Sequence, residues 1–225
     1  MTKLKSITAQ IYQDLCQAIT EGFLKPGQLL KEVELQEQFG VSRAPIREAI
    51  RLLEADKLVV VSAYKNKHVR QIKRSDLIDI IPVLACLEGC AVRLAVPRIS
   101  DDQIKALCNM NEEIREAFRA GNFDQCNVLN FKFHGLYVEV ADNEAVVQAL
   151  RPVMKRIIHL WVTKLYALRP YLFKKTIGEH EKIIETLFAR NAERAEAMVR
   201  EHIEKVLDRA LRESVFDEEG NFKML

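Results

Sequence analysis

Residues 32–56 read EVELQEQFGVSRAPIREAIRLLEAD, which predicts a helix, a tight turn and a second helix. Gly40 supplies the permissive backbone of the turn, and Val41 is expected to fill the angle between the two helices. Apolar residues are predicted to share one face of the first helix: Val33, Leu35 and Phe39. The buried stripe of the second helix is predicted to hold Ile46, Ile50 and Leu53.

The start of the second helix carries the residues that point to DNA. Ser42 is suited to the N-cap, and Pro45 falls in the first turn, where a missing N–H costs little. Arg43, Ala44 and Arg47 are predicted to stay exposed near the N-terminal end, the part of a recognition helix that meets base edges and phosphates. We interpret the segment as a DNA reader, although the motif alone leaves an ordinary amphipathic helical hairpin open as an alternative.

A basic β-hairpin is predicted after these helices. Residues 58–61 and 69–72 are β-prone, and the polar segment between them suits a hairpin tip. Residues 62–74 contain no Asp or Glu. The candidate DNA contacts of this hairpin are Lys65, Asn66, Lys67 and His68. Three helices followed by a hairpin are the order of a winged helix, so the hairpin favours DNA binding over the plain helical alternative.

The composition is that of an ordinary globular protein, with 225 residues of which 48% are hydrophobic and 29% are charged. No apolar stretch has the length of a membrane span, and the N-terminus lacks the apolar core of a secretion signal. We therefore expect a cytoplasmic protein without membrane contact. The five cysteines form no disulfide framework or CxxC zinc site, and Cys86 and Cys90 are expected to be buried on one helix face.

Charge is distributed unevenly along the chain. Residues 1–73 hold 12 Lys and Arg against 8 Asp and Glu, whereas residues 74–225 hold 22 against 24. The basic excess therefore belongs to the part that is predicted to bind DNA. Because the excess is modest, a homodimer that uses two such domains is more plausible than a single copy on DNA.

The second part of the chain is predicted to be entirely helical, which makes the fold mainly α. Strand patterning stops near residue 72 and Ser75 can cap a new helix, so the predicted domains are a winged helix-turn-helix over 1–73 and a helical bundle over 74–225. The first helix of the chain is predicted over 6–21, with a buried stripe of Ile7, Ile11, Leu15 and Ile19. The bundle helices are predicted over 75–96, 101–120, 124–141, 144–168, 172–190 and 192–215.

Three histidines of the helical part are placed where they can meet. Asn130 and His134 are four residues apart and so project from one helix face, while His180 and His202 lie in two other predicted helices. Such positions can converge inside a bundle to hold a metal ion. From the residues alone, buried histidines that only make hydrogen bonds are the commoner alternative.

The chain as a whole resembles the GntR superfamily of transcriptional regulators, in its FadR-like subfamily with an all-helical FCD effector domain. The resemblance rests on VSRAPIREAIRLLE in the N-terminal part, and on LEGCAVRLA, NFKFHGLYVEVADNE and GEHEKIIETLFARNAERA in the C-terminal part. It implies that Arg43 and Arg47 read the DNA major groove, with Ser42, Ala44 and Pro45 beside them. It also implies that the domain over 74–225 binds an effector and dimerises.

The same resemblance implies a divalent metal site in the helical domain. Many FCD domains bind metal through an Asp or Asn and three histidines, and the matching residues here are Asn130, His134, His180 and His202. Three imidazoles suit Zn²⁺ or Ni²⁺ better than Mg²⁺ or Ca²⁺. Because Asn130 stands where most members have Asp and brings no charge, the metal affinity is expected to be lower.

Two further positions depart from the family pattern. FCD helices often carry an arginine, four residues before the Glu of the LEG segment, that can hold a ligand carboxylate; here Leu84 precedes Glu88, so an organic-acid effector lacks that partner. The wing tip commonly has glycine, but here Asn66 is expected to take the left-handed conformation. The candidates for the effector pocket are Glu88, Arg93 and Tyr137. The alternatives are that Arg93 is an exposed surface charge and that Tyr137 is an aromatic residue of the core.

These patterns together predict a homodimeric regulator that binds a pseudo-palindromic operator on double-stranded DNA and a small metabolite in its helical domain. Relief of repression by the ligand is the commoner direction in the family, which implies a repressor. A metal-dependent hydrolase is a rival interpretation of three histidines, but the sequence has no HExxH motif and the DNA-reading segment would be unexplained. A DNA-binding protein that responds to no ligand is the third alternative.

Overall fold

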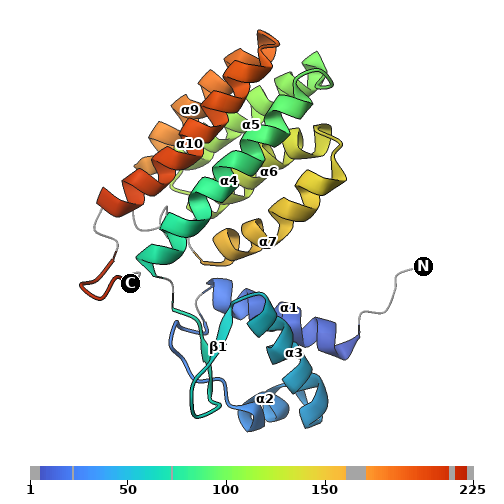
Figure 1. Cartoon of the computed structure of the whole chain (residues 1–225), viewed down its shortest axis with the longest axis vertical. Coiled ribbons are helices and arrows are strands. Elements are labelled where there is room, and N and C mark those ends of the chain that lie inside the picture. The colour runs from blue at the N-terminus through green and yellow to red at the C-terminus, as the bar shows by residue number, and fades with distance from the viewer. Residues whose placement is uncertain (1–5, 22, 72, 161–170, 213–215, 222–225) are drawn as a thin grey trace. The chain divides into compact units, whose positions relative to one another are not determined.

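The computed structural model describes residues 6–21, 23–71, 73–160, 171–212 and 216–221. The chain divides into two compact units: unit 1, formed mainly by residues 1–72, and unit 2, formed mainly by residues 73–225. The described part of unit 1 holds helices and a β-hairpin, whereas that of unit 2 is a bundle of helices (Figure 1). The mainly helical fold that the sequence predicts is confirmed.

Unit 1 begins with α1 (Ile7–Glu21), α2 (Glu32–Phe39) and α3 (Arg43–Ala55). The predicted stripe of α3 is buried, and Ala49 joins it, so the buried face is Ile46, Ala49, Ile50 and Leu53. Gly40 ends α2 with a φ of 63°, a left-handed conformation that glycine adopts without a steric penalty. Ile7 was predicted to be buried but is 53% exposed, and Val33, which was predicted to share the apolar face of its helix, is 64% exposed. Both lie in the first turn of their helix.

The hairpin of unit 1 begins its second strand earlier than predicted. β1 (Val59–Val61) pairs with the antiparallel β2 (Lys67–Val69), so Lys67 and His68 lie in a strand and not in the loop. The turn is tight because the Ser62 N–H donates to the Asn66 carbonyl at 2.8 Å and the Lys65 N–H donates to the Ser62 carbonyl at 2.9 Å. It places Lys65 in the left-handed region, with a φ of 61°, so the expectation that Asn66 would adopt this conformation was wrong.

Unit 2 closely follows the predicted order of helices. Its described helices are α4 (Arg74–Ala95), α5 (Asp101–Arg119), α6 (Phe123–Val140), α7 (Glu144–Leu160), α9 (Leu172–Phe188) and α10 (Ala192–Arg212). Their ends agree with the predicted ends to within two residues, except that 161–168 and 213–215 lie outside the described residues. A local signal sets the start of α5: the Ser100 hydroxyl accepts a hydrogen bond from the Gln103 N–H, and the Gln103 side chain accepts one from the Ser100 N–H.

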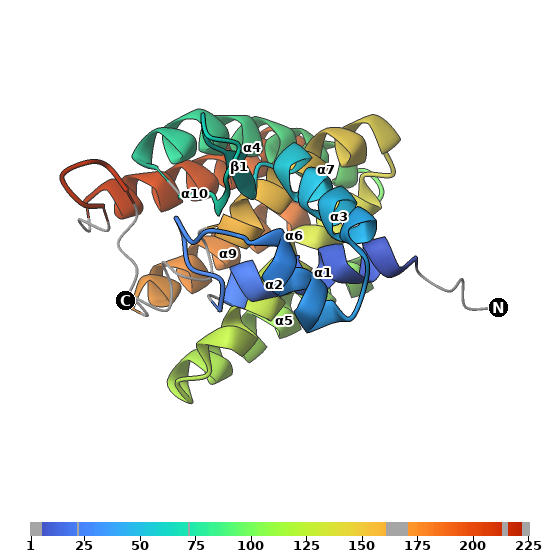
Figure 2. The same ribbon diagram turned by 90° about the horizontal axis from the view of Figure 1, so that it is seen from below.

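Five of the described helices of unit 2 close into a ring of contacts around a shared core. α4 packs on α6, α6 on α5, α5 on α9, α9 on α10, and α10 returns to lie along α4 (Figures 1 and 2). Large side chains with almost no exposed surface fill the interior, among them Ile104, Leu107, Phe133, Tyr137 and Phe173. Side chains that project inward from α6, α9 and α10 can therefore meet although they are far apart in sequence.

α4 and α10 approach each other closely at Gly89. A Cβ atom at this position would lie 2.7 Å from Cγ of Arg200 and 3.3 Å from Cγ of Glu196. Both of those atoms belong to the inner part of their side chains, so they cannot simply swing away. Gly135 on α6 is a matched helical glycine, because a Cβ there would meet no atom within 4 Å.

Gly89→Leu is therefore expected to lower the free energy of unfolding by about 1–3 kcal/mol, because the new side chain forces α4 and α10 apart. Gly135→Leu is expected to leave stability unchanged or to raise it by up to about 1 kcal/mol, since leucine favours helix over glycine. Thermal denaturation of the two variants beside the unchanged protein checks this difference. Equal melting temperatures in both variants would contradict the close helix contact.

Cys86 and Cys90 of α4 are exposed, so their predicted burial is wrong. The buried residues of α4 turn toward its partner helices and leave the face with the cysteines uncovered.

None of the helices in the described part of the chain combines the length and the apolar character that crossing a bilayer requires.

Candidate functional site

The exposed start of α3 presents the residues that were predicted to contact DNA. Ser42 occupies the N-cap with an extended backbone, although its hydroxyl makes no cap hydrogen bond. Ala44 is exposed and Pro45 is partly buried. The side chains of Arg43 and Arg47 are 67% and 63% exposed. Two guanidinium groups at the positive end of a helix form a surface that attracts phosphates and the acceptor atoms of bases.

The hairpin carries the second group of predicted DNA contacts. Lys65 and Asn66 are exposed at its tip, whereas Lys67 and His68 are partly buried in β2. The His68 Nδ1–H donates to the Gly27 carbonyl at 3.2 Å, which ties the hairpin to the segment before α2. The sequence pattern did not single out Glu32, whose carboxylate contacts basic residues of both α3 and the hairpin.

Three histidines of unit 2 converge as predicted from their spacing. His134 comes from α6, His180 from α9 and His202 from α10, and one ligand nitrogen from each lies within 4.8 Å of the other two. All three side chains are buried, with 7%, 0% and 4% exposure. Nitrogens that bind one zinc ion at about 2.0–2.1 Å lie roughly 3–4 Å apart, so a small contraction brings this triad into coordinating range.

Each histidine of the triad uses its Nδ1 atom for a hydrogen bond inside the protein. The acceptors are Glu88 Oε2 for His134 at 2.6 Å, Asn111 Oδ1 for His180 at 3.2 Å, and Glu179 Oε2 for His202 at 2.8 Å. An Nδ1–H that donates in this way fixes the tautomer and leaves the Nε2 lone pair free. This is the arrangement that metal-binding histidines show, because the outer acceptor orients the ring and raises its basicity.

Two polar atoms at the triad lack a partner. Among the described residues, neither His180 Nε2 nor Asn130 Oδ1 makes a hydrogen bond, although both atoms are buried. Burial of a polar atom without a partner costs about 1–3 kcal/mol, so such atoms usually bind something. Asn130 lines the same cavity as His134 and His202, which makes its carbonyl oxygen a fourth donor beside the triad.

Stacking and hydrogen bonding hold His180 rigidly. The ring of Phe133 stacks on it, with ring centroids 3.9 Å apart and planes 5° from parallel. Asn111, which accepts from His180, is itself fixed because its Nδ2 donates to the Ile177 carbonyl at 3.1 Å. His180 is therefore held in a fixed orientation before any ion binds.

Burial lowers the pKa of two of the three histidines, His180 and His202. It lowers the pKa of His180 well below the usual histidine value, and the neighbouring His202 and His134 lower it further. Burial also lowers the pKa of His202, although Glu179 opposes that effect. Burial alone would raise the pKa of the Glu88 carboxyl, but the electrostatic interaction with His134 and the hydrogen bonds that Glu88 accepts lower it instead. Neutral imidazoles at His180 and His202, beside the ionised Glu88 carboxylate, suit a cation.

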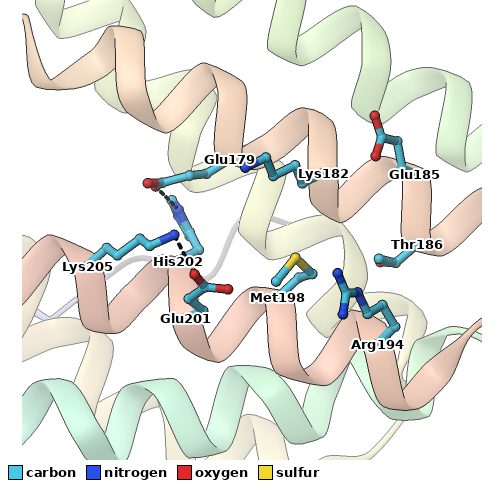
Figure 3. A pocket seen from close by; sticks show the side chains of 9 residues that line it. All are labelled: Glu179, Lys182, Glu185, Thr186, Arg194, Met198, Glu201, His202 and Lys205. Carbon is cyan, nitrogen blue, oxygen red and sulfur yellow. Dashed lines mark hydrogen bonds and ion pairs between the residues drawn. The ribbon is translucent and has the colours of Figure 1, made fainter.

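Two hollows adjoin the triad. An inner cavity of about 50 Å³ is bounded by Leu84, Glu88, Asn130, His134, Met154 and His202. An outer groove of about 360 Å³ lies between α9 and α10, and its lining is highly charged (Figure 3). Figure 3 shows the Glu179 carboxylate reaching His202 from α9, while Lys205 pairs with Glu201 on α10. The inner cavity is the smaller hollow, but it alone contains two triad histidines and the free Asn130 oxygen.

Of the three residues predicted for an effector pocket, Glu88 and Tyr137 lie near the inner cavity, whereas Arg93 does not. Glu88 borders the inner cavity, and the Tyr137 hydroxyl donates to Glu88 and lies 2.7 Å from His134 Nδ1. Burial raises the pKa of Tyr137, and the neighbouring Glu88 carboxylate raises it further, so the phenol keeps its proton. The structure does not bring Arg93 to this cavity, because its exposed guanidinium pairs with Glu196 of α10 at 3.0 Å.

The surroundings of the triad offer no general base to a hydrolase within the described residues. Glu181, next to His180 in sequence, pairs with Arg115 at 2.5 Å, and Glu201, next to His202, pairs with Lys205 at 2.5 Å. Glu88 is held by the His134 ring and the Tyr137 hydroxyl. The arrangement is suited to holding an ion and one further oxygen donor, and the carboxylates around it serve as hydrogen-bond acceptors.

Two family models match the chain. The model for bacterial regulatory proteins of the gntR family matches residues 7–65, and the model for the FCD domain matches residues 79–205. The first covers the helices and most of the hairpin of unit 1, and the second covers the four candidate metal donors of unit 2.

Known regulators are similar over most of their length. The HTH-type transcriptional regulator YdhC of Bacillus subtilis is 31% identical over 194 residues, which are 86% of each chain. The Nta operon transcriptional regulator of Aminobacter aminovorans is 30% identical over 191 residues, 83% of this chain and 86% of its own. The solved structure of Escherichia coli McbR/YncC covers 93% of this chain and 99% of its own, with a TM-score of 0.74 at 22% identity, which shows a shared fold.

Proposed function

Because this chain belongs to the gntR family of bacterial regulatory proteins and carries an FCD domain, we propose that it is a homodimeric repressor that a small metabolite releases from its operator. Members of this family are DNA-binding transcriptional regulators and not enzymes. In the proposal, residues 1–73 form the winged helix-turn-helix domain, and residues 74–225 form the domain that binds the effector and dimerises. The protein acts in the cytoplasm, where its operator is.

DNA recognition is assigned to unit 1. The exposed Arg43 and Arg47 enter the major groove, with Ser42, Ala44 and Pro45 beside them, and the hairpin contributes Lys65, Asn66, Lys67 and His68. Helix N-terminal residues are the usual base-contacting part of a recognition helix. In a dimer, each of the two DNA-binding domains would bind one half-site of a pseudo-palindromic duplex. The dimer would therefore make twice as many phosphate contacts as one domain, whose basic excess is modest.

A divalent transition metal is assigned to the triad. The observation that carries this assignment is a pair of buried atoms that lack a partner among the described residues, His180 Nε2 and Asn130 Oδ1. They lie beside two more histidines whose Nδ1 atoms already make hydrogen bonds. Three imidazoles and an amide oxygen fit Zn²⁺ or Ni²⁺, and the neutral Asn130 lowers the affinity relative to an Asp. When bound, the ion supplies a Lewis-acid position that an oxygen of the effector can occupy.

The effector is assigned to the inner cavity beside the triad. A volume of about 50 Å³ holds little more than one water molecule, so a metabolite requires the cavity to open. Met154 is a suitable moving part, because methionine side chains adapt their shape easily. The conformation of unit 2 that binds the effector must then have a wider cavity than the conformation described here. A ligand that binds one of two conformations more tightly shifts the equilibrium toward it.

A ligand screen on the dimer tests the proposal. Light scattering is expected to show two chains per particle at micromolar concentration, with and without a duplex selected from a random pool by the protein itself. Metabolites with oxygen donors are then screened for a rise in the melting temperature of the protein. A ligand at 100 times its Kd stabilises the folded state by about 2.7 kcal/mol, which raises that temperature. The true effector is expected to change duplex affinity as well. A chain that stays monomeric with DNA would rule out the palindromic arrangement, and a hit without any effect on DNA binding would rule out the effector role.

A further inference from the structure

Three basic groups of unit 1 converge on one carboxylate. The first residue of α2, Glu32, has a side chain that is only 11% exposed. Its Oε2 accepts a hydrogen bond from Nε of Arg43 at 2.6 Å, and its Oε1 accepts one from Nζ of Lys67 at 2.5 Å. Nε of Arg47 lies 3.8 Å from the same Oε1. The two arginines belong to α3 and the lysine to β2, so Glu32 joins the recognition helix to the hairpin.

The contacted atoms leave the outer edge of each arginine available. Both guanidinium groups face Glu32 through Nε, and within the described part of the chain their terminal NH₂ groups donate no hydrogen bond. A guanidinium group has five N–H donors in a rigid plane. With its Nε hydrogen-bonded to the carboxylate, the plane of the Arg43 guanidinium is fixed, and its two NH₂ groups remain for the bidentate contact to guanine O6 and N7.

We propose that Glu32 is a specificity-determining residue, which orients Arg43 for base contacts and, as an ion-pair partner of both Arg43 and Arg47, reduces their attraction to DNA of any sequence. This inference rests on the proposed role of these arginines in the major groove. An arginine that is oriented in advance loses less conformational freedom when it meets the correct base. The carboxylate also repels phosphates, so the contribution of sequence-independent electrostatic binding is smaller.

The test compares two glutamates of α2 that carry the same charge. Glu32→Gln removes the carboxylate charge beside the arginines. Glu34→Gln removes an equal charge from a side chain that is 63% exposed and pairs only with Lys31, at 2.7 Å, among the described residues. The affinity of each full-length variant is measured for a duplex selected from a random pool by the unchanged protein, and for a scrambled duplex of the same length and composition, at two salt concentrations.

Glu32→Gln is expected to lower the preference for the selected duplex over the scrambled one by about tenfold or more, through weaker binding to the first and tighter binding to the second. Glu34→Gln is expected to keep that preference within about twofold, because it changes only net charge. Circular dichroism confirms that each variant is folded. Should Glu32→Gln not fold, Glu32→Asp takes its place under the same criteria, since its carboxylate is too short to hold all three partners.

Equal preferences in Glu32→Gln and Glu34→Gln would overturn the inference, because net charge alone would then explain both. That outcome leaves operator recognition intact, since the unchanged protein still prefers its selected duplex. An unchanged protein that enriches no sequence from the pool would overturn the proposed operator recognition, and this inference with it. The two failures are therefore distinguishable in one experiment.

Discussion

Arg47→Ala is expected to weaken binding to the selected operator duplex by at least about tenfold while leaving the melting temperature unchanged. The side chain is 63% exposed at the start of α3 and does not belong to the buried face of that helix, so its removal is expected to leave the fold intact. A bidentate contact to a base contributes about 1–3 kcal/mol of discrimination, and its loss accounts for the expected change. Fluorescence anisotropy with labelled duplex measures the effect directly.

A charge-matched control separates recognition from electrostatics. Arg119→Ala removes the same charge from the exposed end of α5, outside the proposed DNA-binding domain, and is expected to change operator affinity by less than about twofold. Binding of the Arg47 variant to scrambled duplex should fall much less than its binding to the operator. Operator affinity that is unchanged in Arg47→Ala would show that α3 is not the recognition helix.

His180→Ala is expected to lower the metal affinity of unit 2 by about 100-fold or more, because it removes a direct donor and even outer partners of metal ligands contribute about 10–100-fold. Untagged protein purified without chelator or added metal should contain about one transition-metal ion per chain, as a single three-histidine site implies. Elemental analysis of the unchanged protein and the variant, side by side, measures both values. Chelation of the unchanged protein should lower its melting temperature, since the ion binds only the folded chain.

Three further variants make the metal result specific. His134→Ala is expected to lose the ion in the same way, whereas His68→Ala, which alters a histidine of the hairpin, should keep it. Asn130→Asp should raise metal affinity, because a carboxylate brings a negative charge to the position of the free amide oxygen. Full metal content in both His134→Ala and His180→Ala would show that the triad is a set of structural histidines.

Local signals in the sequence located the helices well, but they did not give the direction in which each face points. The turn at Gly40 and the cap at Ser100 are set by neighbouring residues, so they could be predicted. Burial depends on which helices pack on which face. Cys86 and Cys90 lie on the uncovered side of α4, although small apolar residues in a helix suggested a core position.

The candidate metal donors could be predicted from the sequence, but their surroundings could not. His134, His180 and His202 stood out because histidine is rare in this chain and because they match a family pattern. Their hydrogen-bond acceptors gave no such signal. Asn111 lies 69 residues from His180, and Glu179 lies 23 residues from His202 on another helix, so only the closed ring of helices brings each pair together.

Glu32 shows the same limit in unit 1. In the sequence it is one of several acidic residues in an amphipathic helix, and nothing marks it as a partner of the recognition helix. The folded chain brings it to basic groups that lie 11 and 35 residues away. Residues that act through another side chain are found only when the packing is known, because their role depends on a distance and an angle and leaves no pattern in the sequence.

The left-handed Lys65 at the hairpin tip has an evolutionary consequence. A residue with a Cβ atom at a φ of 61° destabilises the fold by about 1–2 kcal/mol relative to glycine, which adopts this conformation freely. Selection for stability alone would therefore replace Lys65 by glycine, and the hairpin would lose a positive charge at its exposed tip. A more heat-resistant descendant of this protein would be expected to hold DNA less tightly, so at this position stability and affinity evolve in opposite directions.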